Sequence, residues 1–264
     1  MSGTAGIWDD LSVRIGTAAA LAAAGAVALW AGGVLFTLLV SVLAGGMTWE
    51  LARMLAPGRP GTASALGAAA ALALAAAATA LPGWATAALL LAPPVAILAL
   101  LGPRGPLAAV FTLLFMLAGA SLLHLRADGG AIAVFWLVAV VVASDVAGYF
   151  AGRRLGGPKL WPRVSPKKTW SGTVAGWAAA ALAGLAFAGS TGAGAALAAV
   201  SVAVAVAAQA GDIAESALKR HVGVKDSSAL LPGHGGLMDR FDAMIGAAVM
   251  VLALRALMAL PGGL

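Results

Sequence analysis

Residues 131–151 read AIAVFWLVAVVVASDVAGYFA, an apolar run that holds a single charged residue, Asp145. A helix needs about 20 mostly apolar residues to cross a bilayer, so this run predicts a transmembrane helix. The whole chain of 264 residues is 62% hydrophobic and has a mean hydropathy of +0.99. Soluble chains average roughly 45–50% apolar residues. The composition therefore predicts an all-α integral membrane protein.

Further apolar runs lie on both sides of this one, and Gly and Pro residues separate them. The predicted spans cover residues 14–31, 34–55, 63–81, 84–101, 106–123, 131–151, 172–190, 193–217 and 243–260. We expect about nine transmembrane helices in one membrane domain. Nearly all polar groups suited to chemistry lie between residues 144 and 242. We therefore interpret residues 1–130 as a scaffold region and residues 131–264 as a catalytic region.

The basic residues indicate how the chain is oriented in the membrane. Nine spans place 14 of the 16 Lys and Arg residues on one side, with Arg126 and Arg255 as the exceptions. Cytoplasmic loops carry an excess of Lys and Arg. The N-terminus is therefore predicted to be cytoplasmic and the C-terminus to lie on the opposite side of a cell inner membrane. The formal charge of +6 suits loops that face anionic headgroups or phosphates.

Residues 216–242, SALKRHVGVKDSSALLPGHGGLMDRFD, concentrate charge in a chain that is only 10% charged. Ionisable groups beside membrane spans are costly and indicate a functional site. At about 100° per residue, Asp212, Ser216 and Lys219 share a narrow arc of one helix, with Glu215 and Arg220 on its flanks. Mutual ion pairing within the helix is the alternative interpretation.

Three aspartates suggest a metal site. Asp239 and Asp242 are three residues apart at a predicted helix start, and together with Asp212 they form a set of oxygen ligands suited to Mg²⁺. Helix capping is the alternative for the pair. There is no zinc-type spacing of His or Cys, so His234 is interpreted as a phosphate or headgroup contact.

Two further segments offer groups for binding anions. Gly235 and Gly236 form a turn whose backbone N–H groups can approach an anion closely, although an ordinary turn between helices is the alternative. The segment RVSPKKTWSG supplies hydroxyls and positive charges before the next span. Its candidate binding residues are Ser165, Lys167, Lys168 and Thr169. Asp145 and Glu215 are candidates for lining a polar cavity.

The charged stretch resembles the signature of the phosphatidate cytidylyltransferases, also called CDP-diacylglycerol synthases. The resemblance is carried by Ser216, Lys219-Arg220, Lys225-Asp226, Pro232, His234-Gly235-Gly236, Asp239-Arg240 and Asp242. Residues 165–169 are similar to the Ser-Pro-x-Lys-Thr motif of the same family. The chain departs from the family pattern at Ser171, where many members carry an acidic residue or Gln, and at Ser228, where Gly is usual.

The resemblance implies that CTP and phosphatidate react to give CDP-diacylglycerol and diphosphate. It implies Mg²⁺ on Asp212 and Asp239, with Asp242 or Asp226 assisting, and a monovalent cation such as K⁺ beside it. The implied catalytic residues are Asp212, Asp239, Lys219 and Arg220. The implied phosphate-binding residues are Lys167, Lys168, Lys219, Arg220 and Arg240, and the other implied substrate contacts are Ser165, Thr169, Ser216, Lys225, His234, Gly235 and Gly236. It further implies a homodimer in contact with membrane lipid, with its site facing the cytoplasm. No nucleic acid partner is expected.

Three alternatives stay open. The first alternative is a CTP-dependent transferase that acts on another lipid phosphate, such as an isoprenoid ether lipid. The second is a member of the family without enzymatic activity. A transporter is the third alternative, but charges along an ion path would be expected near the middle of several spans. Here they gather at one predicted membrane face.

Overall fold

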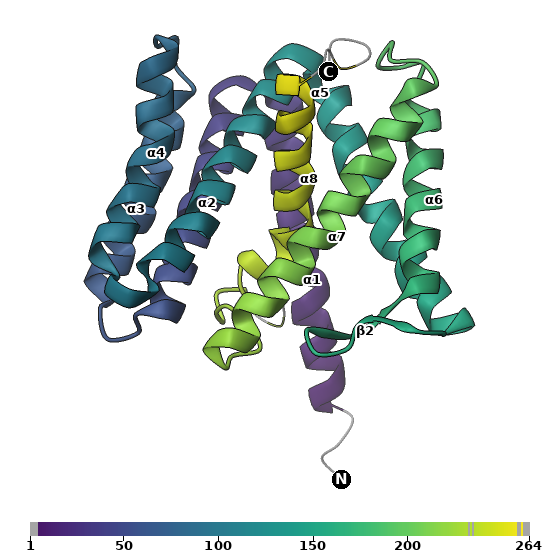
Figure 1. Ribbon diagram of the computed structural model, residues 1–264, viewed down its shortest axis with the longest axis horizontal. Coiled ribbons are helices and arrows are strands. Elements are labelled where there is room, and N and C mark those ends of the chain that lie inside the picture. The colour runs from purple at the N-terminus through teal and green to yellow at the C-terminus, as the bar shows by residue number, and fades with distance from the viewer. Residues whose placement is uncertain (1–4, 232, 234, 258–259, 261–264) are drawn as a thin grey trace. The chain divides into compact units, whose positions relative to one another are not determined.

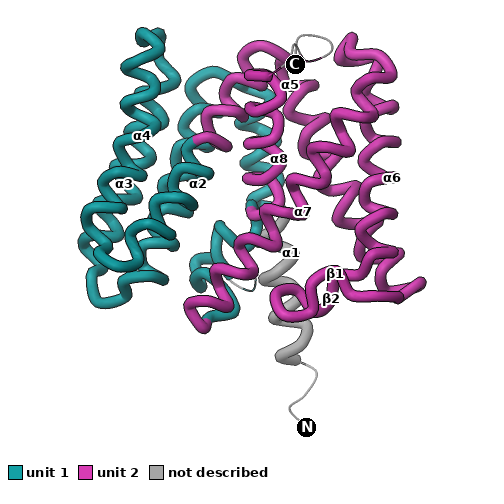
Figure 2. The backbone as a smooth tube through the Cα atoms, in the orientation of Figure 1, with its two compact units in different colours: residues 1–116, 224–241 teal, residues 117–223, 242–264 magenta. Residues whose placement is uncertain are grey.

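The computed structural model describes residues 5–231, 233, 235–257 and 260. It forms two compact units, coloured separately in Figure 2. The first contains the chain up to Met116 together with Val224–Phe241, and the second contains Leu117–Gly223 together with the chain from Asp242 onward. These units differ from the functional division at residue 130, which stays a prediction.

The described residues of the first unit form four helices before the start of α5, together with a short 3₁₀ turn. Their bounds are Ala5–Ala31 (α1), Gly33–Leu55 (α2), Pro60–Ala77 (α3), Gly83–Leu100 (α4) and Gly102–Arg104 (η1). Helices α2, α3 and α4 run side by side in Figure 1. A Cβ atom on Gly67 would lie 2.7 Å from the Cβ of Trp49. The small residue therefore lets α3 approach α2 closely, as is usual for helices packed in lipid.

The second unit contains the long helix α5 after its first turns, followed by three helices and a hairpin. The bounds are Gly105–Leu155 (α5), Lys159–Trp161 (β1), Ser165–Thr169 (β2), Trp170–Phe187 (α6), Ala196–Val222 (α7) and Met238–Leu257 (α8). Helix α5 covers two predicted spans. It is interrupted at Gly130, whose φ of 70° and ψ of −169° are not helical, in the break expected between those spans. Helices α6 and α7 pack against each other (Figure 1).

The structure supports a multi-pass helical membrane protein. Among the described residues, six helical segments are long and apolar enough to cross a membrane: Gly33–Leu55, Pro60–Ala77, Gly83–Leu100, Gly102–Leu155, Trp170–Phe187 and Ala196–Val222. The segment with α5 counts once although it covers two predicted spans. The apolar part of α1 is shorter, and charged residues in α8 lower its hydropathy. The number nine and the orientation of the termini stay predictions.

A β-hairpin replaces the loop expected before α6. Strands β1 and β2 pair in antiparallel fashion, with Lys159 opposite Thr169 and Trp161 opposite Ser165. Prolines at positions 158, 162 and 166 disfavour a helix in this segment. The short sheet fixes the direction of the lysines on both strands, which a flexible loop would not do.

Candidate functional site

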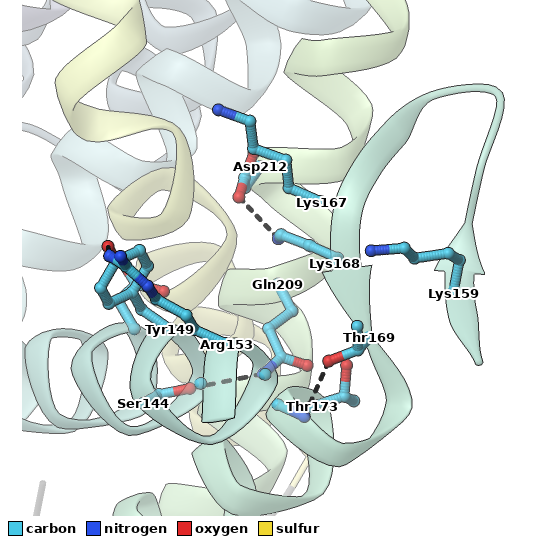
Figure 3. Close-up of a pocket in the computed structure, with 14 residues that line it drawn as sticks. Ser144, Tyr149, Arg153, Lys159, Lys167, Lys168, Thr169, Thr173, Gln209 and Asp212 are labelled. Atoms are coloured by element: carbon cyan, nitrogen blue, oxygen red, sulfur yellow. Dashed lines mark hydrogen bonds and ion pairs between the residues drawn. The ribbon is translucent and has the colours of Figure 1, made fainter. Parts of the chain in front are cut away.

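The second unit contains a cavity of about 610 Å³ that is lined by residues of α5, the hairpin, α6 and α7 (Figure 3). Its basic lining residues are Arg153, Lys159, Lys167 and Lys168. Its acidic lining residues are Asp145 and Asp212, and its uncharged polar lining includes Ser144, Thr169, Thr173 and Gln209. Cations exceed carboxylates in this lining. The cavity therefore favours an anionic ligand, because charge-assisted hydrogen bonds to ionised oxygens are strong.

The hairpin leads directly into α6 through a capped helix start. Thr169 is buried, and its Oγ1 accepts a hydrogen bond from the N–H of Gly172 at 3.2 Å. This is the usual way for a threonine to satisfy a free N–H at a helix start. The hydroxyl of Ser171 donates to the carbonyl oxygen of Gly156 and lies 3.0 Å from Thr169 Oγ1. Ser171, where the chain departs from the family pattern, thus ties the start of α6 to the end of α5.

An ion pair crosses from the hairpin to α7. Lys168 Nζ lies 2.6 Å from Asp212 Oδ2, and Ser216 Oγ donates to Asp212 Oδ1 at 3.3 Å. Figure 3 shows the Lys168 side chain pointing at Asp212. Both groups are half-buried, where a charge pair is less screened than at the surface. A bound phosphate would compete for Lys168, and a bound cation would compete for Asp212.

Gln209 joins three helices at the cavity. Its Oε1 accepts from the indole N–H of Trp177 on α6 at 3.1 Å, and its Nε2 lies 3.5 Å from Ser144 Oγ on α5. Such hydrogen bonds between helices hold polar side chains in one orientation inside a membrane protein. They fix the amide of Gln209 on the wall of the cavity.

Glycines bring α5 and α6 close together beside the cavity. A Cβ atom on Gly172 would lie 2.5 Å from the carbonyl oxygen of Gly148, and one on Gly152 would lie 2.8 Å from Thr169 Oγ1. Real Cβ atoms do not approach other atoms this closely. Glycine at these positions is therefore required by the close approach of the two helices.

A similar approach joins α7 to α8. A Cβ atom on Gly211 would lie 2.5 Å from the carbonyl oxygen of Asp242, which precedes the predicted span 243–260. Burial raises the pKa of the Asp242 carboxyl above its ordinary value, opposed by a hydrogen bond with Glu215 and reinforced by the negative charge of Asp212. Glu215 Oε1 also lies 3.2 Å from Lys219 Nζ, one helical turn away. Carboxylates of α7 and α8 therefore influence one another within this unit.

The first unit holds a second polar cluster, centred on Glu50 of α2. Glu50 is 0% exposed. Its Oε1 accepts from Ser228 Oγ at 2.6 Å and from the N–H of Leu237 at 2.8 Å, and its Oε2 accepts from Ser227 Oγ at 3.2 Å and from the N–H of Met238 at 2.8 Å. The N–H groups of Leu237 and Met238 lie at the start of α8, where free donors favour a negative charge.

Asp239 holds the neighbouring loop. Its Oδ2 accepts from the N–H of Ser227 at 2.9 Å, from Ser227 Oγ at 3.1 Å and from the N–H of Gly236 at 2.8 Å. These donors belong to the loop before α8, so the bonds hold the loop, and the capping alternative rests only on the position of Asp239 in the first turn of α8. Its assignment as a metal ligand and catalytic residue stays a prediction.

The turn before α8 needs its two glycines for different reasons. Gly235 has a φ of +80°, which side chains with a Cβ rarely adopt. A Cβ atom on Gly236 would lie 2.5 Å from Glu50 Oε1. His234, predicted to contact a phosphate, lies outside the described residues. The two glycines thus bring the turn close to Glu50, and their contact with substrate stays a prediction.

Comparison with known proteins identifies the family. A model of the cytidylyltransferase family matches residues 12–258. The chain belongs to the cytidylyltransferase family. It is 43% identical over 162 residues to a phosphatidate cytidylyltransferase of Brucella suis. The aligned stretch covers 61% of this chain and 60% of that protein.

Two further relatives carry the same name. The protein of Helicobacter pylori is 43% identical over 130 residues, or 48% of each chain. The protein of Bacillus subtilis is 39% identical over 115 residues, or 42% of this chain and 43% of that protein. The matched part thus spans about three fifths of the Brucella protein and less than half of the other two.

The residues predicted for the site fall into both units. The second unit holds Asp145, Ser165, Lys167, Lys168, Thr169, Asp212, Glu215, Ser216, Lys219, Arg220 and Asp242, and the first holds Lys225, Asp226, Gly235, Gly236, Asp239 and Arg240. The cavity brings together Asp145, Asp212, Lys167, Lys168 and Thr169. Among the described residues, no group of three His, Asp or Glu side chains is placed to hold a metal ion. The magnesium site of this family member stays a prediction.

Sequence reasoning missed Glu50, Gln209 and Ser227. Each lies in a run that the sequence explained otherwise, as an apolar span or as a spacer within the charged motif. One signal was available, because Glu50 is a carboxylate within the predicted span 34–55. An ionisable residue at such a position has a functional partner by default.

Proposed function

We propose that this protein is a phosphatidate cytidylyltransferase, which converts CTP and phosphatidate to CDP-diacylglycerol and diphosphate. The observation that supports this most directly is the cavity lined by Arg153, Lys159, Lys167 and Lys168. Family membership and relatives named for this activity agree with it. A cavity of about 610 Å³ also lies within the range of small-molecule sites, roughly 300–1,000 Å³.

The proposed reaction needs positioning and charge neutralisation more than covalent help from the protein. A phosphate oxygen of phosphatidate attacks the α-phosphorus of CTP, and the bond from that phosphorus to the diphosphate oxygen breaks. The attacking phosphate is already ionised, so no general base has to remove a proton. Lys167 and Lys168 neutralise the nucleotide phosphates, and Lys219, Arg220 and Arg240 are the further cations assigned to the phosphates.

We propose Mg²⁺ as the cofactor, together with a monovalent cation such as K⁺. Mg²⁺ is usually held by one or two carboxylates plus substrate phosphates, and in the second unit Asp212 and Asp242 are carboxylates that influence each other electrostatically. Carboxylate oxygens are ligands that suit the ion, so Asp212 and Asp242 are the candidates in the second unit, and Asp226 and Asp239 are the candidates in the first. When bound, Mg²⁺ supplies positive charge to the phosphate oxygens.

The proposed membrane setting follows the distribution of basic residues. We place the hairpin and the cavity at the cytoplasmic side of an inner membrane, where CTP is available, in a protein of about nine spans. The N-terminus is cytoplasmic and the C-terminus lies on the opposite side. Phosphatidate reaches the site from the bilayer, and the assembly is a homodimer.

The test is an assay of the detergent-purified full chain with CTP, phosphatidate and Mg²⁺, in which CDP-diacylglycerol and diphosphate are both measured. Lys168→Ala removes the cation that pairs with Asp212, and we expect kcat/KM to fall about 100-fold or more, because charge-assisted contacts to phosphate are lost. Arg163→Ala is the matched control. Arg163 is an exposed basic residue of the same hairpin outside the cavity lining, so its kcat/KM should stay within about twofold of wild type.

Each outcome separates the alternatives. Product from wild type and the control but not from Lys168→Ala supports the proposal. If a CDP-lipid forms only with an isoprenoid ether lipid phosphate, that lipid and not phosphatidate is the acceptor. No cytidylyl transfer to any lipid phosphate by folded wild type would refute the activity.

A further inference from the structure

The buried carboxylate of Glu50 lies outside the motif that carries the family resemblance, yet it contacts that motif on two sides. Its four hydrogen-bond donors come from Ser227, Ser228, Leu237 and Met238. The first two follow Lys225 and Asp226 in the loop after α7, and the last two lie at the start of α8. Glu50 therefore connects both ends of the segment that contains the His-Gly-Gly turn.

The contacts of Glu50 are all groups that can donate to a carboxylate oxygen. Two lie at each oxygen, and one of the four, the Ser227 hydroxyl, is shared with Asp239. A charge inside an apolar helix bundle is costly unless it is paired and hydrogen-bonded. An apolar residue of the same size could fill this position but could not accept hydrogen bonds from the loop and from the start of α8. We therefore expect Glu50 to have a role beyond packing.

Ser227 connects Glu50 to Asp239. The Ser227 hydroxyl lies 3.2 Å from Glu50 Oε2 and 3.1 Å from Asp239 Oδ2, and it has one hydrogen to donate. The N–H of Ser227 also donates to Asp239 Oδ2. Moving Glu50 therefore moves both the loop and the hydrogen bonds that orient the Asp239 carboxylate.

We propose that Glu50 is a positioning residue for the reaction, which acts through Ser227 and the start of α8 to orient Asp239. This rests on the proposed function. Glu50 touches neither substrate nor metal in this role. Its effect is to hold the loop 225–230 and the turn 235–238 in the conformation that catalysis uses.

The kinetic test uses Glu50→Gln in the full chain, assayed as above. Glutamine has nearly the same shape, but its NH₂ group faces two donors that it cannot accept from. We expect kcat to fall about 10- to 100-fold, the range expected when a catalytic group is misplaced, while KM for CTP changes less than about threefold. Thr48→Val is the matched control, because Thr48 is a buried polar residue of α2 whose hydroxyl donates to the carbonyl oxygen of Ala44 in the same helix. Its kcat should stay near wild type.

A second readout does not depend on activity. The chain has no cysteine, so Ala229→Cys carries a single spin label on an exposed residue of the loop, and Ala87→Cys carries one on α4 as a reference. With Glu50→Gln, we expect the label at residue 229 to become more mobile in its electron paramagnetic resonance spectrum. The label at residue 87 should be unchanged.

The two readouts keep the proposals separate. If wild type makes no CDP-diacylglycerol, the proposed function fails, and the spin labels still test whether Glu50 holds the loop. If Glu50→Gln does not fold, Ser228→Ala removes one donor to Glu50, together with the acceptor of the Leu230 N–H, and should lower kcat about threefold to tenfold with a more mobile loop label. Unchanged kcat together with an unchanged loop label in these variants would overturn the role of Glu50. An equal rise in mobility at residue 87 would also overturn it, since the effect would then be general loss of structure.

Discussion

At the scale of single residues, Asp239 shows why a loss of activity does not identify a metal ligand. Its Oδ2 accepts three hydrogen bonds from Ser227 and Gly236. Replacing the carboxylate changes any metal site and also releases the loop. Asp212 is the clearer position for testing the cofactor, because in the described part of the chain it binds the side chains of Lys168 and Ser216 and not a backbone N–H of the loop.

Asp239→Ala should loosen the loop in the absence of substrate and metal. Removing the carboxylate leaves the N–H groups of Ser227 and Gly236 without the acceptor that they have in wild type, which costs about 1–3 kcal/mol when they are shielded from water. We expect amide hydrogen exchange at Ser227 and Gly236 to speed up by about 10- to 100-fold. Asp128→Asn removes a carboxylate of α5 and should leave both amides unchanged. Equal exchange in wild type and Asp239→Ala would show that Asp239 does not hold the loop.

At the scale of secondary-structure elements, the site depends on helices that approach through glycine. Gly148 and Gly172 bring α5 and α6 together next to the hairpin, and Gly211 does the same for α7 and α8. In lipid there is little hydrophobic force between helices, so close van der Waals contact provides much of the association. The cavity lining therefore depends on residues that have no chemistry of their own.

Gly172→Ala should destabilise the packing of α6 on α5. Its Cβ would lie 2.5 Å from the carbonyl oxygen of Gly148, and overpacking of this kind costs about 1–3 kcal/mol. We expect a lower midpoint of thermal unfolding in detergent, measured by intrinsic fluorescence. Gly189→Ala is the control, since no atom lies within 4 Å of its Cβ position and its midpoint should match wild type. If the midpoint of Gly172→Ala equals that of the control, α5 and α6 can accommodate the added methyl group without loss of stability.

At the scale of the whole molecule, the proposed orientation can be tested on one helix. Helix α6 has 18 residues and is about 27 Å long at 1.5 Å per residue, close to the thickness of a bilayer core. The hairpin precedes it and the turn with Ser190 follows it. The two connections should therefore face opposite sides of the membrane.

Single cysteines at Arg163 and Ser190, both exposed, test this orientation in a chain without native cysteine. In inverted vesicles, a membrane-impermeant maleimide should label Arg163→Cys and leave Ser190→Cys unlabelled. In intact spheroplasts the pattern should reverse. Labelling of both positions from one side would refute a spanning α6, and the opposite pattern would refute a cytoplasmic hairpin.

The sequence alone determined much of this protein. The spacing of apolar runs predicted the helices, because the length needed to cross a membrane is a local property of the chain. It also placed the break at Gly130 and gathered the charged residues near residues 165–169 and 212–242. The sequence predicted Lys167, Lys168 and Asp212 as site residues, but it did not predict Lys159 of the same hairpin. The hairpin itself was not expected, because the prolines excluded a helix without specifying how the strands would pair.

Only the tertiary structure decided which polar groups meet. Glu50 and its partners Ser227 and Met238 are separated by 177 and 188 residues, and Gln209 lies 65 residues from Ser144. No local pattern encodes such a pairing, because hydrogen bonds depend on where the helices pack. The sequence determines that a buried carboxylate needs donors, and the packing of α2 against the loop and the start of α8 determines which donors it finds.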